Sequence, residues 1–170
     1  MKEKRRYYYS VCPTRFGWVG LLGSARGLRR TTLPQPTAAN ARAGLGPESE
    51  GALPGEGFFD DLAERLRRYF AGEVVTFPDA LDLSGRPRFF CNVWRQACNI
   101  PYGEQRAYRW LAEQAGSPRA CRAAGQAMAR NPLPIIVPCH RVLGSDGSLC
   151  GFGGGLPLKE RLIALEARRV

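Results

Sequence analysis

The pattern of this chain changes near residue 85, and that change limits the fold more than any other feature. Before it, short aromatic and β-branched runs alternate with turn residues and one segment has a helical period, whereas after it several short segments have a helical period. The net charge changes at the same place, from +3 (13 cations, 10 anions) over residues 1–86 to +7 (12 cations, 5 anions) over residues 87–170. We therefore expect an α+β protein with a small strand-and-helix domain over residues 1–85 and a mostly helical domain over residues 86–170.

The first domain begins with strand-like runs. Residues 7–11 and 16–22 are aromatic and β-branched, and the four residues between them, 12–15, predict a hairpin turn. Residues 27–33 have the composition of a third strand. Together these runs predict a small sheet.

A long segment without a regular pattern follows. Residues 34–57 are rich in Pro, Gly and Ala, so we expect a flexible loop there, with at most a short helix over 38–43. Residues 58–70 then place apolar side chains at helical spacing, with Asp60 and Asp61 in the first turn. They predict one helix, and this domain shows no catalytic constellation.

The second domain is predicted to start with a helix that ends before Pro101. Ser84 is a candidate N-cap, and Pro87 suits the first turn of a helix that runs to about Cys98.

Two further helical segments are separated by a short turn. Residues 108–115 and 119–130 flank Gly116, Ser117 and Pro118. The glycine suits the end of the first helix, and the serine and proline suit the N-cap and first turn of the second. This arrangement is typical of a helix-turn-helix motif, but an ordinary helical hairpin in a protein core has the same pattern.

Arginine supplies 22 of the 25 basic residues, and the sequence pI is about 9.8. An arginine-rich basic half favours a polyanionic partner, for which nucleic acid is the default, although a GC-rich genome would also replace lysine by arginine. No apolar run approaches the roughly 20 residues that span a bilayer, and residues 7–24 make a poor secretory segment. We expect a cytoplasmic protein with no membrane partner.

The chain has one histidine and six cysteines. A single histidine excludes mechanisms that need two, including most zinc hydrolase sites. None of the cysteines forms a C-x-x-C pair, which argues against a zinc ribbon or a thioredoxin-type redox pair. In a reducing cytoplasm we expect free thiols, most of them small buried apolar side chains.

The one histidine lies next to a cysteine that follows a proline. The apolar residues 135–137 predict a short buried strand, Pro138 ends it, and Cys139 and His140 come next. A thiolate is the nucleophilic form of cysteine, and imidazole can accept the thiol proton if a carboxylate orients its other nitrogen. Adjacent side chains need not face each other, so this pair alone is weak evidence of a nucleophile.

A glycine-rich loop and a helix follow the pair. Residues 151–155 lack the spacing of a phosphate-binding loop, so their glycines would instead let backbone groups approach a flat ligand. Residues 158–169 predict an amphipathic C-terminal helix. On it, Glu166 is either a functional carboxylate or a surface partner of Arg169 or Lys159.

The chain contains four short motifs: I-P-Y-G-E at 100–104, N-P-L-P at 131–134, P-C-H-R-V at 138–142 and G-F-G-G-G at 151–155. Together they resemble the motifs of the O6-alkylguanine-DNA alkyltransferases, also called methylated-DNA–protein-cysteine methyltransferases. The resemblance covers residues 85–169 closely, whereas residues 1–80 fit the family's N-terminal α+β domain in layout only. It implies DNA repair by transfer of an alkyl group to a protein cysteine from O6 of guanine, with O4 of thymine as a second candidate.

The resemblance implies the catalytic residues by position. Cys139 is similar to the acceptor thiol, His140 to the base that deprotonates it through a water, and Glu166 to the carboxylate that orients His140. Asn131 resembles the residue that ties the helix-turn-helix to the active-site turn. The product is a thioether that ordinary cellular reductants do not reverse, so each molecule would act once and would need no cofactor.

The resemblance also implies how damaged DNA is bound. Double-stranded DNA with O6-alkylguanine would bind through its minor groove, and the target base would be flipped out of the duplex. Tyr108 is similar to the tyrosine that contacts the flipped base and rotates its phosphate, and Arg122 to the arginine that fills the vacated stack. The protein would act as a monomer, with no obligate protein partner.

Backbone groups would recognise the guanine edge. This role falls to the carbonyls of Cys139 and Val142 and to the N–H of Gly153, while Pro134 would line the alkyl pocket. Phe152 stands where many relatives have tyrosine, so any role of that hydroxyl is absent.

Two cysteines outside the predicted acceptor position bear on the family's other properties. Cys150 occupies a loop position where a small residue or threonine is usual, so we expect it to reshape the alkyl pocket and to raise the risk of oxidation together with Cys139. A structural zinc, as in some relatives, would need several N-terminal Cys and His ligands. Cys12 alone cannot supply them, so we predict no metal.

Two other classes of function stay open. A helix-turn-helix protein could recognise alkylated DNA without transferring the group, but relatives of that kind lack the acceptor cysteine. A cysteine hydrolase could use Cys139 and His140 on a small ester. Stoichiometric methylation of Cys139 would separate the transferase from both.

Overall fold

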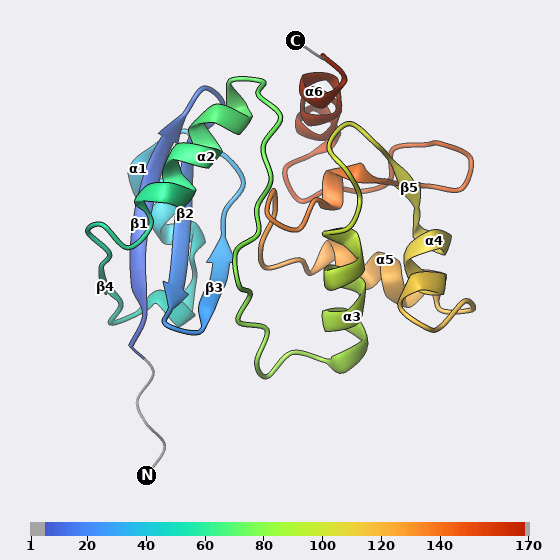
Figure 1. Ribbon diagram of the computed structural model, residues 1–170, viewed down its shortest axis with the longest axis horizontal. Coiled ribbons are helices and arrows are strands. Elements are labelled where there is room, and N and C mark those ends of the chain that lie inside the picture. The colour runs from blue at the N-terminus through green and yellow to red at the C-terminus, as the bar shows by residue number, and fades with distance from the viewer. Residues whose placement is uncertain (1–5, 169–170) are drawn as a thin grey trace. The chain divides into compact units, whose positions relative to one another are not determined.

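The computed structural model describes residues 6–168 (Figure 1). The chain forms two compact units that divide after Leu83, close to the boundary expected after residue 85. That the two units are independent domains remains a prediction. The combination of strands and helices confirms the α+β class.

A four-stranded sheet forms the centre of the first unit. Its strands are β1 (Tyr8–Thr14), β2 (Gly17–Ser24), β3 (Gly27–Thr31) and β4 (Leu53–Pro54), in the order β3-β2-β1-β4. β2 pairs antiparallel with β1 and β3, whereas β4 pairs parallel with β1. Figure 1 shows α2 (Asp60–Phe70) in front of the sheet and α1 (Ala38–Gly44) behind it. Because both faces are covered, β2 is buried without interruption from Val19 to Ser24.

The predicted hairpin is confirmed, but its turn is shorter than expected. β1 continues to Thr14, so residues 15–16 make the turn instead of residues 12–15. Cys12 belongs to the strand because its side chain is buried against α2, where its thiol donates to the carbonyl of Ala63 at 3.6 Å. The predicted third strand and the predicted helix are confirmed as β3 and α2.

The segment expected to be a flexible loop, residues 34–57, contains three short elements. α1 is followed by a 3-10 turn at Pro47–Ser49 and then by β4. Leu45 is fully buried, and Glu48 accepts hydrogen bonds from Arg29 at 2.6 and 3.0 Å. The short helix predicted over residues 38–43 is confirmed as α1, whereas the 3-10 turn and β4 were not predicted. The glycines and prolines of this segment separate short elements that are held by contacts with the sheet.

Helices dominate the second unit. Its elements are α3 (Arg88–Ala97), α4 (Tyr108–Gln114), α5 (Cys121–Ala129) and α6 (Leu156–Ala167), with a parallel pair of two-residue strands, β5 (Arg106–Ala107) and β6 (Val142–Leu143). Trp94 of α3 is buried, and its indole nitrogen donates to the carbonyl of Ala127 in α5 at 2.8 Å. No helix within residues 6–168 combines the length and the apolar character needed to cross a membrane.

Both helices of the predicted helix-turn-helix are present, but the second begins later than expected. Gly116 has a φ of +84° and ends α4. Its N–H donates to the carbonyl of Glu113 at 3.0 Å, and the N–H of Ser117 donates to that of Ala112 at 2.9 Å, which is a Schellman motif. Ser117 therefore belongs to the cap of α4 and does not cap α5, which begins at Cys121.

Other local predictions in this unit were also wrong. α3 begins directly after Pro87, so Ser84 is not its N-cap. Residues 135–137 are buried as expected, but they form a turn and not a strand, because Ile135 has a φ of +75°. The terminal helix begins at Leu156, two residues earlier than predicted.

Candidate active site

A short turn carries Cys139. Residues Cys139–Arg141 form one 3-10 turn that leads directly into β6. Asn131, which follows α5, fixes this turn from one side. Its side-chain nitrogen donates to the carbonyl of Val137 at 2.9 Å, and its side-chain oxygen accepts from the N–H of Leu133 at 2.9 Å. Asn131 thus connects the end of α5 to the segment that precedes Cys139.

The thiol of Cys139 is buried. The residue is 8% exposed, and burial raises the pKa of its thiol above the usual value. A hydrogen bond from Asn131 and the positive charge of Lys159 act in the opposite direction. The thiol therefore needs a base, a nearby cation, or both to become a nucleophile near neutral pH.

His140 is completely buried and contacts a carboxylate. Its Nε2 lies 2.6 Å from Oε1 of Glu166, which α6 supplies. An ionised carboxylate can only accept, so we assign the proton to Nε2, which gives Nδ1 the lone pair. Burial lowers the pKa of His140, and the hydrogen bond to Glu166 opposes this shift. His140 is thus a neutral imidazole in the tautomer that can accept a proton at Nδ1.

Glu166 is held by three groups. Besides His140, the Nε of Arg141 donates to Oε2 at 2.9 Å, and the N–H of Gly103 donates to the same oxygen at 3.1 Å. Burial alone would raise the pKa of Glu166, but the hydrogen bonds from His140 and Arg141 outweigh it and lower the pKa to about 2. Glu166 is 3% exposed and pairs within the site, so the alternative of a surface partnership with Lys159 is wrong. Arg169 lies outside the described residues.

Two site residues were not predicted from the sequence. Arg141, the residue after His140, clamps Glu166 and also donates to the carbonyl of Ile100 at 2.7 Å. Lys159 of α6 is fully buried, and its Nζ donates to the carbonyl of Val142 at 2.7 Å. The sequence does carry a signal for the second, because Lys159 is the only lysine after residue 4 in an arginine-rich chain.

Tyr108 lies near the thiols of Cys139 and Cys150. It is the first residue of α4, and burial raises the pKa of its phenol to about 12, with smaller contributions from the nearby thiols of Cys150 and Cys139. The phenol therefore stays protonated at neutral pH and can donate a hydrogen bond. Of the predicted catalytic residues, Cys139 is the one that Tyr108 lies near enough to influence electrostatically.

The predicted guanine-recognition residues differ in exposure. Val142 is buried in β6, Pro134 and Phe152 are half-buried, and Gly153 is exposed. The ring of Phe152 lies 6.0 Å from Nζ of Lys159, so the glycine-rich loop passes over the same lysine that holds Val142.

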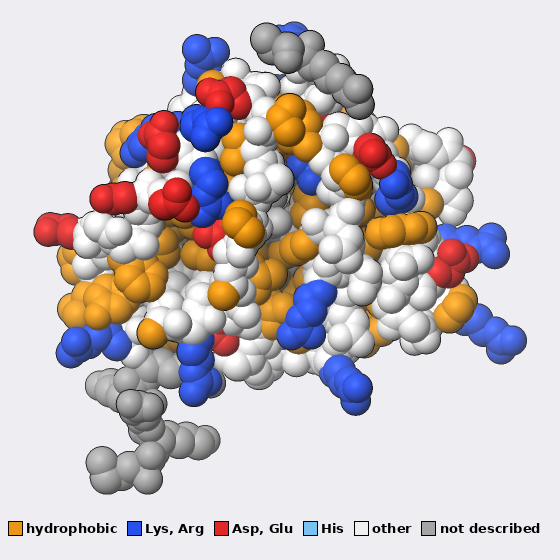
Figure 2. Space-filling model, viewed as in Figure 1, with side chains coloured by type: hydrophobic (Ala, Val, Ile, Leu, Met, Phe, Trp, Pro, Cys, Tyr) orange, Lys and Arg blue, Asp and Glu red, His pale blue; other side chains and the backbone are white. Residues whose placement is uncertain are grey.

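Arg122 lies apart from this cluster. It is the second residue of α5 and is exposed. Figure 2 shows basic side chains over the second unit with few acidic ones between them, whereas the first unit mixes the two kinds. This surface charge suits a polyanion.

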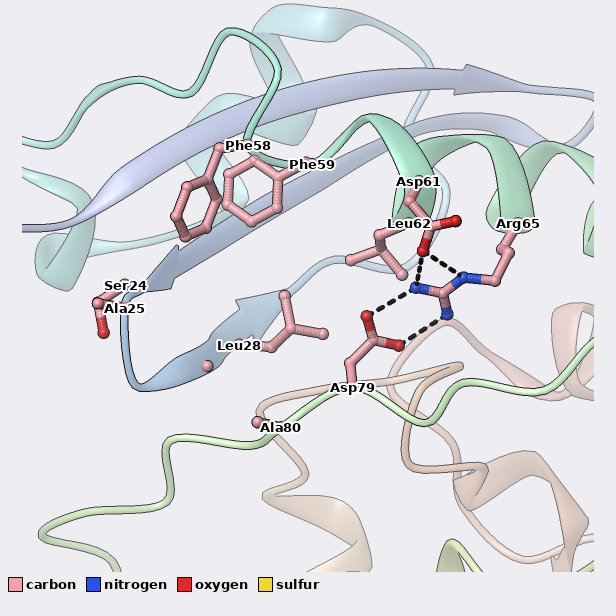
Figure 3. A pocket seen from close by; sticks show the side chains of 11 residues that line it. Ser24, Ala25, Leu28, Phe58, Phe59, Asp61, Leu62, Arg65, Asp79 and Ala80 are labelled. Atoms are coloured by element: carbon pink, nitrogen blue, oxygen red, sulfur yellow. Dashed lines mark hydrogen bonds and ion pairs between the residues drawn. The ribbon is translucent and has the colours of Figure 1, made fainter.

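The first unit contains a separate cavity of about 320 Å³ (Figure 3). Phe58 and Phe59 line one side of it, and Arg65 lies on the other side between two carboxylates. Arg65 donates to both oxygens of Asp79 at 2.7 Å and to Asp61 at 2.8 and 3.0 Å. These bonds satisfy the guanidinium and fasten α2 to the segment that follows it.

Comparisons with known proteins agree on one family. Residues 88–168 match a family model described as the DNA-binding domain of 6-O-methylguanine DNA methyltransferase. A methylated-DNA–protein-cysteine methyltransferase of Mycobacterium leprae is 49% identical over 124 residues, which are 73% of this chain and 74% of that protein. One of Methanosarcina barkeri is 38% identical over 168 residues, covering 94% and 96% of the two chains. The crystal structure of Mycobacterium tuberculosis OGT in complex with DNA is similar with a TM-score of 0.80 and 37% identity, covering 94% of this chain and 92% of that one.

Proposed function

The chain belongs to the methylated-DNA–protein-cysteine methyltransferase family, and we therefore propose that Cys139 is the residue that receives the alkyl group. The protein binds DNA and repairs it by alkyl transfer. The observation that supports Cys139 most strongly is the contact of 2.6 Å between Nε2 of His140 and Glu166, because it orients a base on the residue that follows Cys139. Cys139 is the only cysteine that is adjacent to a histidine in the sequence.

In the proposed reaction, His140 takes the thiol proton at Nδ1, directly or through a water molecule. The thiolate attacks the alkyl carbon on O6 of guanine, and the S–C bond forms as the C–O6 bond breaks. The leaving guanine takes up the proton that the thiol lost, so the products are an S-alkylcysteine and unmodified guanine. No step restores the thiol, so each molecule reacts once, and the same chemistry on O4 of thymine would balance in the same way.

We propose that the damaged base is flipped into the site from the minor groove. The target carbon is inaccessible inside a duplex, and unstacking one base costs a few kcal/mol. The exposed Arg122 is suited to fill the vacated stack, and the protonated phenol of Tyr108 is suited to donate to the flipped guanine. Phosphate contacts by other arginines of this basic unit would offset the remaining cost.

The guanine edge would contact backbone groups near Cys139. We assign this role to the carbonyls of Cys139 and Val142 and to the N–H of Gly153, with Pro134 and Phe152 beside the alkyl group. A carbonyl oxygen has two lone pairs, so that of Val142 can accept from Lys159 and from guanine together.

The proposal places the reaction in the cytoplasm, without a cofactor or an obligate protein partner. A reducing compartment suits it, because the six cysteines are free thiols and the reaction consumes one of them.

Methylation of the protein itself tests this function. The intact protein is incubated with a duplex that contains one O6-methylguanine, and mass spectrometry then locates the methyl group. We expect one methyl per molecule, on Cys139, and none after Cys139→Ser. Cys121→Ser is the matched control, because Cys121 is a more accessible thiol, and it should be methylated like the wild type.

Two results would overturn the assignment. Binding of the damaged duplex without a gain in mass would favour a recognition protein, and product formation beyond one equivalent would favour a hydrolase.

A further inference from the structure

The buried charges around Cys139 do not balance while its thiol is protonated. Among the described residues of the second unit, four polar side chains are buried: His140, Arg141, Lys159 and Glu166. Arg141 and Lys159 are cations, Glu166 is an anion, and His140 is neutral. The cluster therefore holds one positive charge in excess.

Lys159 is the cation that has no carboxylate. Arg141 pairs with Glu166 at 2.9 Å, whereas Lys159 donates to two carbonyls, those of Val142 at 2.7 Å and Cys150 at 3.5 Å. Within residues 6–168, no carboxylate lies at ion-pair distance from its Nζ. Burial lowers the pKa of Lys159, and negative charge on a nearby group opposes this shift, so an anion beside Lys159 is needed to hold its charged form.

The choice of lysine at this position is itself informative. The chain uses arginine at 22 of its 25 basic positions, yet position 159 is lysine. A compact ammonium concentrates its charge at one atom and fits between two carbonyls, whereas a planar guanidinium spreads its charge over a fork of donors. The compact charge of a lysine therefore suits this position better than the guanidinium of an arginine.

Few neighbouring groups can become the missing anion. Burial raises the pKa of Tyr108 to about 12 and that of Cys98 to about 11, so both stay neutral at physiological pH. Cys139 and Cys150 remain, and both act electrostatically on Lys159. Cys150 is half-buried and its thiol points to the carbonyl of Ser148, at 3.9 Å, whereas Cys139 is buried with the cation.

We propose that Lys159 is the counter-charge of the Cys139 thiolate, so that the buried cluster is electrically balanced only after the proton of Cys139 has passed through His140 and left the cluster. His140 then provides the path by which the proton leaves, and Lys159 keeps the thiolate available for attack. Lys159 donates to the backbone carbonyls of Val142 and Cys150, so we assign it a positioning role. The inference rests on the proposed role of Cys139 as acceptor.

A titration of the Cys139 thiolate by its ultraviolet absorbance tests this role. Each protein is measured against its own Cys139→Ser form, so that the difference reports this thiol alone. Lys159→Gln keeps a hydrogen-bond donor for Val142 but removes the charge, and it should hold about tenfold less thiolate at a given pH than the wild type. Lys159→Arg, which keeps the charge, should hold more thiolate than Lys159→Gln.

The matched control is Arg161→Gln, which removes one positive charge from an exposed position of the same helix. It should titrate like the wild type, and circular dichroism confirms folding of each variant. If folded Lys159→Gln titrates like the wild type, or if Arg161→Gln shifts the titration as much as Lys159→Gln does, the proposal is overturned.

A second measurement leaves Lys159 in place. The chain has three lysines, Lys2, Lys4 and Lys159, so carbon-13 labelling of lysine side chains gives three signals that can be followed against pH by NMR. We expect Lys159 to keep its proton to higher pH in the wild type than in Cys139→Ser, which lacks the thiolate. Identical titration of Lys159 in both proteins would refute the proposal, even if Lys159→Gln does not fold.

Both titrations are made without DNA. Failure of the methyl-transfer assay would therefore count against the proposed function and leave the thiolate titration interpretable. Normal methylation of Cys139 with an unchanged titration would refute the role of Lys159 alone.

Discussion

Glu166 shows how much a single residue contributes to this site. Its two oxygens fix the tautomer of His140, neutralise Arg141 and accept the N–H of Gly103. The position of the proposed base, the charge balance and the path of the segment around Gly103 therefore depend on one carboxylate.

Replacing this carboxylate by an amide tests all three roles. Glu166→Gln should slow methyl transfer about 100-fold or more, because His140 loses the acceptor that orients it. It should also lower the free energy of unfolding by about 3 kcal/mol, because Arg141 stays buried without an anion. Single-turnover methylation and urea unfolding measure the two effects. Glu160→Gln, at an exposed position of the same helix, is the control, and an unchanged rate in folded Glu166→Gln would contradict the assignment.

The stability of the protein should fall in acid as Glu166 takes up a proton. Burial alone would raise its pKa, but hydrogen bonds from His140 and Arg141 lower it to about 2 in the folded protein, against an ordinary value of 4.5. The unfolded chain therefore binds this proton first, so the contribution of Glu166 is complete above the ordinary pKa and disappears as the pH falls toward 2. The difference amounts to about 3 kcal/mol. Urea unfolding across this range should show the loss in the wild type and a shallower slope in Glu166→Gln.

Among the elements, α2 is fastened by an ion pair to the segment that follows it. Arg65 and Asp79 are both 17% exposed, whereas the second partner, Asp61, is 87% exposed. Asp79→Asn should lower the free energy of unfolding by about 1 to 2 kcal/mol, because a partly buried bidentate pair is broken. Asp61→Asn is the control and should change it by less than about 0.5 kcal/mol. If the two variants lowered the free energy of unfolding equally, the burial of Asp79 would not explain its contribution to stability, and the prediction would be wrong.

Elements whose own residues decide their conformation were predictable. α2 and α4 have a clear helical period, and Gly116 marks the end of α4 because it adopts a positive φ. Elements decided by distant contacts were not predictable. The two-residue β4 exists through its pairing with β1, and the turn at Ile135 is held between the two hydrogen bonds of Asn131.

The same distinction applies to the site. Cys139 and His140 are adjacent, so a local motif was enough to single them out, whereas Glu166 reaches His140 from 26 positions further along the chain and the residues alone left its role open. Lys159 was considered only as a surface partner of Glu166, because a sequence does not show that a lysine is buried. Lys159 is buried because α6 packs against the turn that carries Cys139, and this packing is seen only in the folded structure.

The charge of the whole molecule should govern its binding to undamaged DNA. The net charge is +10, and +7 of it lies in residues 87–170. Binding through phosphate contacts releases counterions, so raising salt from 50 to 200 mM should weaken the affinity by about 1,000-fold or more if the protein makes six or more such contacts. Fluorescence anisotropy with an undamaged duplex measures this dependence. Arg122→Ala should leave the salt slope nearly unchanged while slowing repair, and a flat salt dependence would show that the basic unit does not carry the binding.

The burial of Lys159 without a carboxylate partner among residues 6–168 predicts that alkylation changes the charge of the protein. A thioether at Cys139 cannot become negative, so under the proposed mechanism a molecule that has repaired one lesion can no longer offset the charge of Lys159 with a thiolate. At a pH where the unreacted protein holds this thiolate, unreacted and alkylated molecules would then differ by one negative charge. Isoelectric focusing could separate the two states, and the charge of a molecule would then show whether it has been alkylated.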